Sequence, residues 1–268
     1  GVYLSGTTGT TVGGALATDG NIIDNSDWDG IKIKGGANNT ARNNTISNST
    51  RVGIYSEASN NVKIWDNNIT NSDIMGGVGV LGGQTISILR NTISNSPTST
   101  SESGIEVTKV TGGDNRIADN YVSSINGYGI NVNKTKNIKV TGNHVWDTNN
   151  DGITLVDDKG TIAVNENTVG KADGSSKIDG NGISLVRIYS GNVLRNNVYH
   201  THTTNYTPPN GNGILLKDSA NINVGTLGNG NYIRNANWDG IKVDGGWNNK
   251  VVGNDIADST RVGVYGTG

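Results

Sequence analysis

Two carboxylic acids and one lysine are the strongest candidates in the sequence for acid–base chemistry. Glu106 and Lys109 lie close together, and Asp151 directly precedes a glycine. Proton transfer needs a base and an acid, and a cation stabilises a nearby anionic group. Glu106, Lys109 and Asp151 are therefore the candidate catalytic residues. Two simpler interpretations stay open: Glu106 and Lys109 form a solvated surface pair, and Asp151 belongs to an Asp-Gly turn.

Amides, hydroxyls and aromatic rings surround these candidates. Such groups suit the binding of sugar hydroxyls and the stacking of sugar rings better than the movement of protons. His200 and His202 could share a metal or act as a base, but their loop holds no carboxylate, and a plain surface loop is the alternative. The candidate substrate-binding residues are Tyr128, Asn131, Asn133, Trp146, Thr154 and Tyr206.

A sequence repeat must position all of these residues. A Gly-Ile or Gly-Val pair recurs from Gly30 to Gly263, and an Asn-x-Ile or Asn-x-Val phrase recurs in step with it, beginning at Asn21 and including Asn231. A sharp corner leaves backbone groups inside the fold, and a buried amide can satisfy them. Amides stacked at one position in every repeat would also bond to each other. We expect an internal ladder of Asn44, Asn67, Asn91, Asn120, Asn143, Asn167, Asn196 and Asn254.

Within each repeat the apolar residues alternate, as in Ile31-x-Ile33 and Ile138-x-Val140. A period of two indicates short strands with one buried face, and no single repeat can bury its apolar residues alone. The sequence therefore predicts an all-β fold, a right-handed, single-stranded parallel β-helix of about eleven coils with three short strands in each coil. We assign residues 1–268 to one such domain. Glycine at the start of each first strand suits a position where a Cβ would clash or φ is positive.

Three insertions lie between the third strand of one coil and the first strand of the next. They run from Asn91 to Gly104, from Asn167 to Gly182 and from Asn196 to Gly213. Loops carried on a rigid scaffold often hold binding sites. These insertions would form two walls around the shorter coils that begin at Gly129 and Gly152. We therefore expect a groove over the face of the first strands.

Composition excludes several classes of function. The chain has 268 residues, a formal net charge of −2, 40 Gly, no Cys and 32% apolar residues. No basic run is present that could bind a nucleic acid, no apolar stretch is long enough to insert into a membrane, and no disulfide or thiolate metal site can form. The low apolar content predicts a thin, repetitive core. No signal peptide is visible, and we expect a mature or excised piece of an extracellular or cell-surface protein.

The three-strand coil, the Asn ladder and the insertions beside the first strand resemble the pectate-lyase-like superfamily of β-helices. This resemblance covers essentially the whole chain and implies a fold with carbohydrate-binding or sugar-hydrolase members. Locally, Tyr128-Gly129-Ile130-Asn131-Val132-Asn133 resembles the Tyr-Gly-Phe-Asp-Pro-His motif of mannuronan C5-epimerases. Likewise, Asn149-Asn150-Asp151-Gly152 resembles the Asn-Thr-Asp-Gly motif of polygalacturonases.

This sequence departs from both families at acid and base residues that their catalysis would use. The Asp and His of the epimerase motif fall on Asn131 and Asn133, and an amide neither gives nor takes a proton at neutral pH. The paired acids of polygalacturonases should follow one coil later, whereas Asp157 and Asp158 follow directly, and the Gly-His-Gly motif is absent. Epimerase chemistry by the family mechanism is therefore not expected. Calcium stays open as a cofactor because carboxylate and amide oxygens are abundant.

Two functions of different classes fit these observations. The first is an extracellular domain that binds a polysaccharide along the groove and could also cleave it, as a lyase or a hydrolase. The second is a non-catalytic structural repeat of a surface layer, sheath, fibre or adhesin. Residues 27–55 and 237–265 match at a constant offset, with Trp28 and Trp238 in the same phrase. This repetition and the absence of capping helices favour further coils in the parent chain or head-to-tail self-association.

Overall fold

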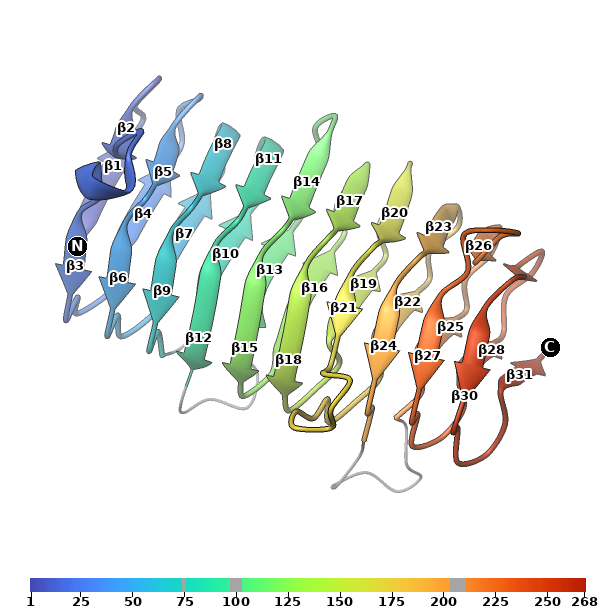
Figure 1. The fold of residues 1–268 in the computed structure, drawn as a ribbon. Coiled ribbons are helices and arrows are strands. Elements are labelled where there is room, and N and C mark those ends of the chain that lie inside the picture. The colour runs from blue at the N-terminus through green and yellow to red at the C-terminus, as the bar shows by residue number, and fades with distance from the viewer. Residues whose placement is uncertain (74–75, 97–102, 203–210) are drawn as a thin grey trace.

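The described part of the computed structural model is a rod of stacked coils (Figure 1) and covers residues 1–73, 76–96, 103–202 and 211–268. Apart from one 3₁₀ turn, η1 (Ala17–Asp19), its regular structure is entirely β-strand. The strands form three parallel sheets, and every full coil adds one strand to each sheet. In these ranges no helix is long and apolar enough to cross a bilayer. The predicted all-β parallel helix with three strands per coil is confirmed.

Each sheet collects every third strand of the chain. Sheet A consists of β1 (Val2–Ser5), β4 (Ile31–Lys34), β7 (Ile54–Glu57), β10 (Val78–Leu81), β13 (Ser103–Thr108), β16 (Tyr128–Asn133), β19 (Ile153–Val156), β22 (Ile183–Val186), β25 (Ile214–Lys217), β28 (Ile241–Asp244) and β31 (Val264–Thr267). Sheet B consists of β2 (Thr11–Gly13), β5 (Thr40–Arg42), β8 (Asn60–Trp65), β11 (Gln84–Leu89), β14 (Asn115–Ala118), β17 (Ile138–Thr141), β20 (Ile162–Asn165), β23 (Gly191–Leu194), β26 (Ile222–Val224) and β29 (Lys250–Val251). Sheet C consists of β3 (Ile22–Asp24), β6 (Thr45–Ser47), β9 (Asn68–Thr70), β12 (Thr92–Ser96), β15 (Tyr121–Ile125), β18 (His144–Thr148), β21 (Thr168–Val169), β24 (Asn197–Tyr199), β27 (Tyr232–Arg234) and β30 (Asp255–Ala257).

The core is a set of columns of β-branched side chains that run along the rod axis. Because the strands are parallel and in register, the same position of every coil stacks on its neighbour, as Ile105 does on Ile130. Parallel neighbours of this shape pack well on a pleated surface. One fully buried column on sheet A contains Ile31, Ile54, Val78, Ile105, Ile130, Ile153, Ile183, Ile214 and Ile241.

The predicted Asn ladder is confirmed and crosses the corner between sheets B and C. The Nδ2 of Asn143 donates to the Oδ1 of Asn167 at 3.0 Å, and the Oδ1 of Asn143 accepts from the Nδ2 of Asn120 at 2.9 Å. Nδ2 also donates to the carbonyl of Ile117 at 3.0 Å, which lies on the preceding coil. An amide inside the ladder therefore joins three coils and satisfies buried backbone groups. The same Nδ2-to-Oδ1 bond links Asn21, Asn44, Asn67, Asn91, Asn120, Asn143, Asn167, Asn196, Asn231 and Asn254 in that order.

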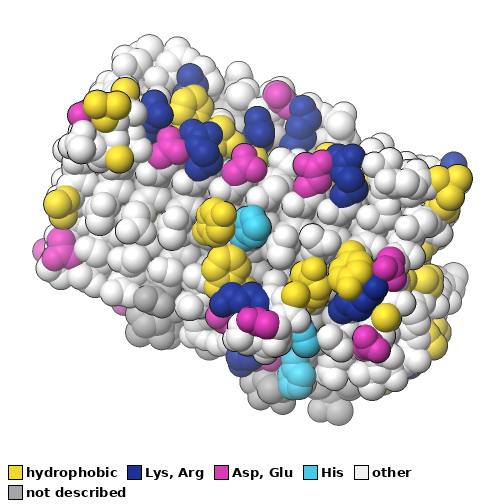
Figure 2. Space-filling view, in the orientation of Figure 1, with side chains coloured by type: hydrophobic (Ala, Val, Ile, Leu, Met, Phe, Trp, Pro, Cys, Tyr) yellow, Lys and Arg dark blue, Asp and Glu magenta, His cyan; other side chains and the backbone are white. Residues whose placement is uncertain are grey.

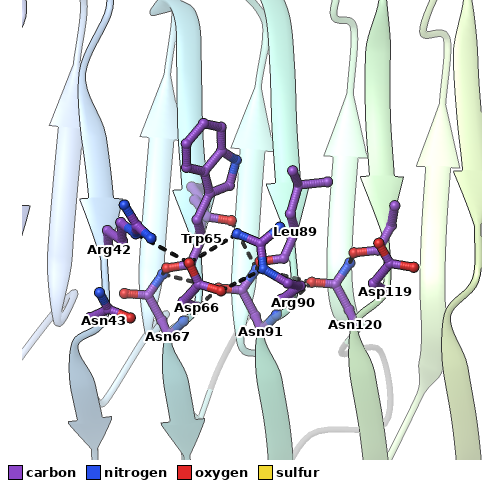
Figure 3. A network of polar contacts seen from close by, with 12 residues as sticks. Arg42, Asn43, Trp65, Asp66, Asn67, Leu89, Arg90, Asn91, Asp119 and Asn120 are labelled. Atoms are coloured by element: carbon purple, nitrogen blue, oxygen red, sulfur yellow. Dashed lines mark hydrogen bonds and ion pairs between the residues drawn. The ribbon is translucent and has the colours of Figure 1, made fainter. Parts of the chain in front are cut away.

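The residue before a ladder Asn makes the corner itself. Asp66, Arg90 and Asp119 take φ values of 58°, 53° and 57°, in the left-handed region, which turns the chain outward before the buried amide. Their side chains then meet on the surface, where Arg90 Nε donates to Asp66 Oδ1 at 2.7 Å (Figure 3). The left-handed conformation expected for the first-strand glycines lies at these polar corner residues instead.

The first-strand glycines are required for space. A Cβ on Gly129 would lie 2.2 Å from Cγ1 of Val145 and 2.5 Å from the carbonyl oxygen of Gly152, both distances far inside van der Waals contact. Gly104, Gly152, Gly182 and Gly240 face the same arrangement of a core side chain and the next carbonyl. Of the two reasons considered for glycine here, the steric one is correct.

Replacement of a mid-rod ladder residue should destabilise the fold. Asn143→Ala removes the acceptor of the backbone N–H of Asn120 and one donor to the carbonyl of Ile117 inside the corner. We expect a loss of about 1–3 kcal/mol in the free energy of unfolding, measured by urea denaturation. Asn68→Ala is the control because Asn68 is exposed on sheet C. Equal stability of the two variants would contradict a structural role for the ladder.

Addition of one methyl group should destabilise the fold at a glycine that has no space for a Cβ, but not at a glycine with open space there. Gly129→Ala must push apart the carbonyl of Gly152 and the side chain of Val145, so we expect overpacking to cost about 1–3 kcal/mol or more. Gly113→Ala is the matched control, since no atom lies within 4 Å of its Cβ position. Thermal melting of both variants tests this, and a normal melting temperature for Gly129→Ala would disprove the steric argument.

Candidate functional site

Sheet A presents the predicted row of outward side chains in the expected register. Glu106 on β13 pairs with Asn131 on β16, and Asn131 pairs with Thr154 on β19. Adjacent strands lie about 4.8 Å apart, so these three side chains form a short polar row along the rod. Glu106 and Asn131 are partly exposed, whereas Thr154 is only 6% exposed.

Asp151 is the organising residue of this area. It lies at the corner before β19, and its Oδ2 accepts from Ser184 Oγ at 2.6 Å and from Thr154 Oγ1 at 3.2 Å. Its Oδ1 accepts from the backbone N of Asn181 at 2.7 Å and from the Asn181 Nδ2 at 3.1 Å. Burial raises the pKa of Asp151, and the hydrogen bonds from Ser184 and Asn181 oppose that shift. Asp151 is thus held far more firmly than an ordinary Asp-Gly turn requires.

Thr154, which the sequence predicts to bind a ligand, turns its hydroxyl toward Asp151. The hydroxyl donates to Asp151, and the side chain is buried. The sequence correctly predicted that Thr154 faces outward on β19, but the side chain of Asp151 folds back over it. Thr154 is a positioning residue for the carboxylate.

Asp151 ends a second ladder, which sequence reasoning missed. Asn212 Nδ2 donates to Asn181 Oδ1 at 2.8 Å, and Asn181 Nδ2 donates in turn to Asp151. The backbone N of Asp239 extends the row by donating to Asn212 Oδ1 at 3.3 Å. The signal was present in the sequence, because an acid or amide directly precedes the coil glycine in four successive coils, at Asp151, Asn181, Asn212 and Asp239.

Glu106 and Lys109 do not form the expected pair. Lys109 is exposed at the turn toward sheet B with φ of 59°, and no ion pair joins it to Glu106 in the part of the chain that the structure describes. Glu106 has Thr108 Oγ1 at 3.5 Å from its Oε1. Burial raises the pKa of Glu106, and the Thr108 hydroxyl opposes this. The polar row therefore contains two carboxyls of raised pKa, Glu106 and Asp151.

The remaining predicted binding residues divide between two faces of the rod. Tyr128 and Asn133 lie at the two ends of β16 and are partly exposed, close to Asn131. Trp146 instead lies on β18 in sheet C, so its assignment to the first-strand face was wrong. The alternation after Val145 turns Trp146 outward on the third strand. Tyr206 lies outside the described residues.

Two of the three insertions expected to wall a groove also include residues outside the described ranges, 97–102 and 203–210. The third insertion, between Asn167 and Gly182, lies at the carboxyl end of sheet C. There Lys171 Nζ stands 5.2 Å from the centre of the Trp146 ring, and Lys177 Nζ bonds to Asp179 at 2.9 Å. This insertion therefore also contributes to a surface on sheet C.

His200 and His202 line a cavity of about 450 Å³ at the foot of sheet C. A carboxylate does reach this loop from the neighbouring coil, with Asp179 Oδ1 at 3.8 Å from His202 Nδ1. Over the described ranges, no group of three or more His, Cys, Asp or Glu side chains is placed to hold a metal ion. Calcium thus stays an expectation without an assigned site.

Trp28 and Trp238 have the repeated structural role expected of them. The Arg51 guanidinium lies 5.2 Å from the Trp28 ring and 4.3 Å from the Tyr55 ring, and it pairs with the buried Asp29. Arg261 repeats this arrangement between the rings of Trp238 and Tyr265, paired with Asp239. The repeated phrase therefore encodes one arginine held between two aromatic rings.

Asp157 and Asp158, adjacent in the sequence, occupy opposite environments. Asp157 faces outward and pairs with Arg187, whose guanidinium lowers the pKa of that carboxyl. Asp158 is 1% exposed inside the corner between sheets A and B, where its Oδ1 accepts from the backbone N of Thr135 at 2.6 Å. Burial raises the pKa of Asp158 to about 7. These acids cannot act together on one ligand.

The comparisons with known proteins settle the family. Residues 1–169 match the family described as right handed beta helix region. The chain belongs to this right-handed β-helix family. No sequence among curated proteins matches the chain significantly.

Solved structures of other β-helix proteins are similar to this chain in fold. The Dettilon tailspike protein superposes with a TM-score of 0.65 at 19% identity, covering 100% of this chain and 57% of that one. A variant of the periplasmic alginate epimerase AlgG superposes with a TM-score of 0.61 at 18% identity, covering 88% of this chain and 64% of that one. The chain thus spans less than two thirds of the length of either protein. At these identities the likeness establishes the fold alone.

Asp158 should make the protein less stable as the pH rises. Its folded pKa of about 7 exceeds the ordinary value of 3.8, so the folded state binds the proton more tightly between these values. The free energy of unfolding therefore falls through that window and levels off above it. Asp158→Asn should lose this fall and exceed the parent in stability at alkaline pH.

Urea denaturation at about pH 5 and about pH 8 measures this linkage. Asp157→Asn is the control, and it should retain most of the fall of the parent, because burial is the largest cause of the raised pKa of Asp158 and the charge of Asp157 contributes less. An unchanged fall in Asp158→Asn would show that another group titrates.

Proposed function

We propose that this β-helix binds an extracellular polysaccharide along the polar row of sheet A. The observation that carries the proposal is the clustering of Glu106, Tyr128, Asn131 and Asn133 on two adjacent strands beside the fixed carboxyl of Asp151. Amide and carboxyl groups bind sugar hydroxyls through directional hydrogen bonds, and a tyrosine ring packs against the apolar face of a sugar. A rigid rod holds these groups at fixed spacing, which reduces the entropic cost of binding.

The similar folds support this ligand class by analogy. One of them is a tailspike protein, and the other is an epimerase of alginate, a polysaccharide. Both likenesses lie under 25% identity, so the analogy only indicates which ligands to test first. A screen by affinity electrophoresis in gels containing alginate, polygalacturonate or dextran tests the proposal. Migration that none of these polymers retards would contradict it.

For a chain that also cleaves its ligand, we propose Glu106 and Asp151 as the acid–base residues. A raised pKa lets a carboxyl hold a proton closer to neutral pH, as a general acid requires. Lys109 is not part of this proposal, because it lies exposed at the turn toward sheet B and forms no ion pair with Glu106 in the described ranges. Incubation with each polymer, followed by assays of reducing ends and of unsaturated products, distinguishes hydrolysis, lyase cleavage and binding alone.

The alternative function is a structural repeat. The identical Trp28–Arg51–Asp29 and Trp238–Arg261–Asp239 arrangements favour it, since they strengthen the rod at two points without forming a site. Under this alternative no polymer binds at the polar row, so replacement of Tyr128 and Asn131 leaves any retardation in the gel unchanged.

Two substitutions on β16 should weaken polysaccharide binding. Tyr128→Ala removes a stacking ring and Asn131→Ala removes two hydrogen-bonding groups, and each loss of about 1 kcal/mol corresponds to a rise of about fivefold in Kd. Trp28→Ala is the control because its ring packs on Arg51 at a distant coil. Affinity electrophoresis of the three variants measures the effect, and equal Kd values for all three would place the site elsewhere.

A further inference from the structure

Sheet C carries an aromatic cluster that the proposed function does not use. The Tyr121 and His144 rings stack at 4.7 Å with an interplanar angle of 4°, and the Trp146 ring meets Tyr121 edge-on at 6.1 Å. Tyr121 is 48% exposed, so this cluster is open to solvent. Figure 2, which looks onto this face, shows hydrophobic side chains gathered beside a histidine at its centre.

A second aromatic pair lies farther along the same sheet. Tyr199 on β24 and Tyr232 on β27 meet edge-on at 5.9 Å, and the guanidinium of Arg234 lies 3.7 Å from the Tyr232 ring. The strand between the clusters, β21, presents only the small Thr168 outward, and the paired position on β24 is Asn197. Two ring clusters are thus separated by a shallow polar stretch that offers a hydroxyl and an amide.

The cavity at the foot of sheet C opens beside these rings. It is lined by residues that directly continue the strands of the second pair, His200 after Tyr199 and Asn235 after Arg234, and by Lys177 from the long insertion. Its volume of about 450 Å³ falls within the range of small-molecule sites. The other polar residues of the lining are Ser176, Thr201, His202, Asn237, Asp258 and Thr260.

Charge on this face gives the class of ligand. Lys171 stands over the Trp146 ring and forms no ion pair in the described ranges, although its charge helps to lower the pKa of Asp173. Asp179 and Asp255 are already paired with Lys177 and Arg234. The cation beside the rings can therefore bind a ligand carboxylate.

We propose that sheet C carries a second saccharide-binding surface, which takes a short stretch of an acidic polysaccharide. Its sugar rings contact Tyr121 and Trp146, a carboxylate pairs with Lys171, and one residue of the chain enters the cavity beside His200. The inference shares its ligand class with the proposed function and is otherwise independent of it, because sheets A and C are different faces of the rod.

Trp65 provides a matched control for Trp146. It lies on the outer face of sheet B, is likewise partly buried, and also has a lysine over its ring, with Lys63 Nζ at 5.0 Å. The experiment titrates the protein with oligosaccharides of alginate, polygalacturonate and dextran and follows tryptophan fluorescence. We expect a change with the two acidic probes, unaltered in Trp65→Ala and lost in Trp146→Ala, with at least fivefold weaker binding for Lys171→Ala and His200→Ala.

The variants of sheet A separate this surface from the polar row. Tyr128→Ala combined with Asn131→Ala should retain the fluorescence change of the parent protein. A fluorescence response that survives in Trp146→Ala, or that disappears only in the sheet A variant, overturns the second surface. Equal responses to dextran and to the acidic probes overturn the acidic assignment. Matching melting temperatures for Trp65→Ala and Trp146→Ala establish that both variants are folded.

Discussion

Every coil of this protein must turn a sharp corner without leaving backbone polar groups unpaired in a dry interior. An unpaired buried amide or carbonyl costs more than a single hydrogen bond returns. The asparagine amide meets this requirement because it offers donors and an acceptor in one small planar group. Asn143 uses all of them, on the two neighbouring ladder residues and on the carbonyl of Ile117. The sheets, their register and the spacing of the surface rows all depend on that corner.

The second ladder shows how the same stacking of side-chain amides can hold a carboxyl group beside a candidate binding site. Asn181 and Asn212 repeat the amide stack at another corner, but the row ends on a carboxyl, Asp151, whose oxygens are held by four donors. Structural bonding thus fixes a titratable group at the edge of the polar row. Asp158 illustrates the opposite outcome, because a carboxyl inside a corner is buried and cannot meet a ligand.

Sequence reasoning reached the fold because the repeat supplies the same information in each coil. The ladder Asn residues, the inward isoleucines and the outward row through Glu106 and Asn131 were all predictable from spacing. The site was only partly predictable, since it depends on where side chains point after a turn. Lys109 follows Glu106 closely, yet the turn after Thr108 carries it to another face. Trp146 precedes Asp151 by a few residues, yet a corner separates sheet C from sheet A. The bonds of Asp151 to Asn181 and Ser184 join different coils, and a local sequence pattern cannot predict such contacts.

The Nδ2-to-Oδ1 bonds of the ladder all run the same way along the rod, from one coil to the Oδ1 of the following coil. Aligned amides polarise one another, so each bond in such a row is strengthened by those on either side. The row therefore behaves as one extended dipole whose parts are not energetically independent. Loss of a central member would leave two shorter rows, whereas loss of a member near one end would leave a long row almost intact. Two replacements in the ladder should consequently depart from additivity, and the coupling between them should depend on how many amides lie between the two positions.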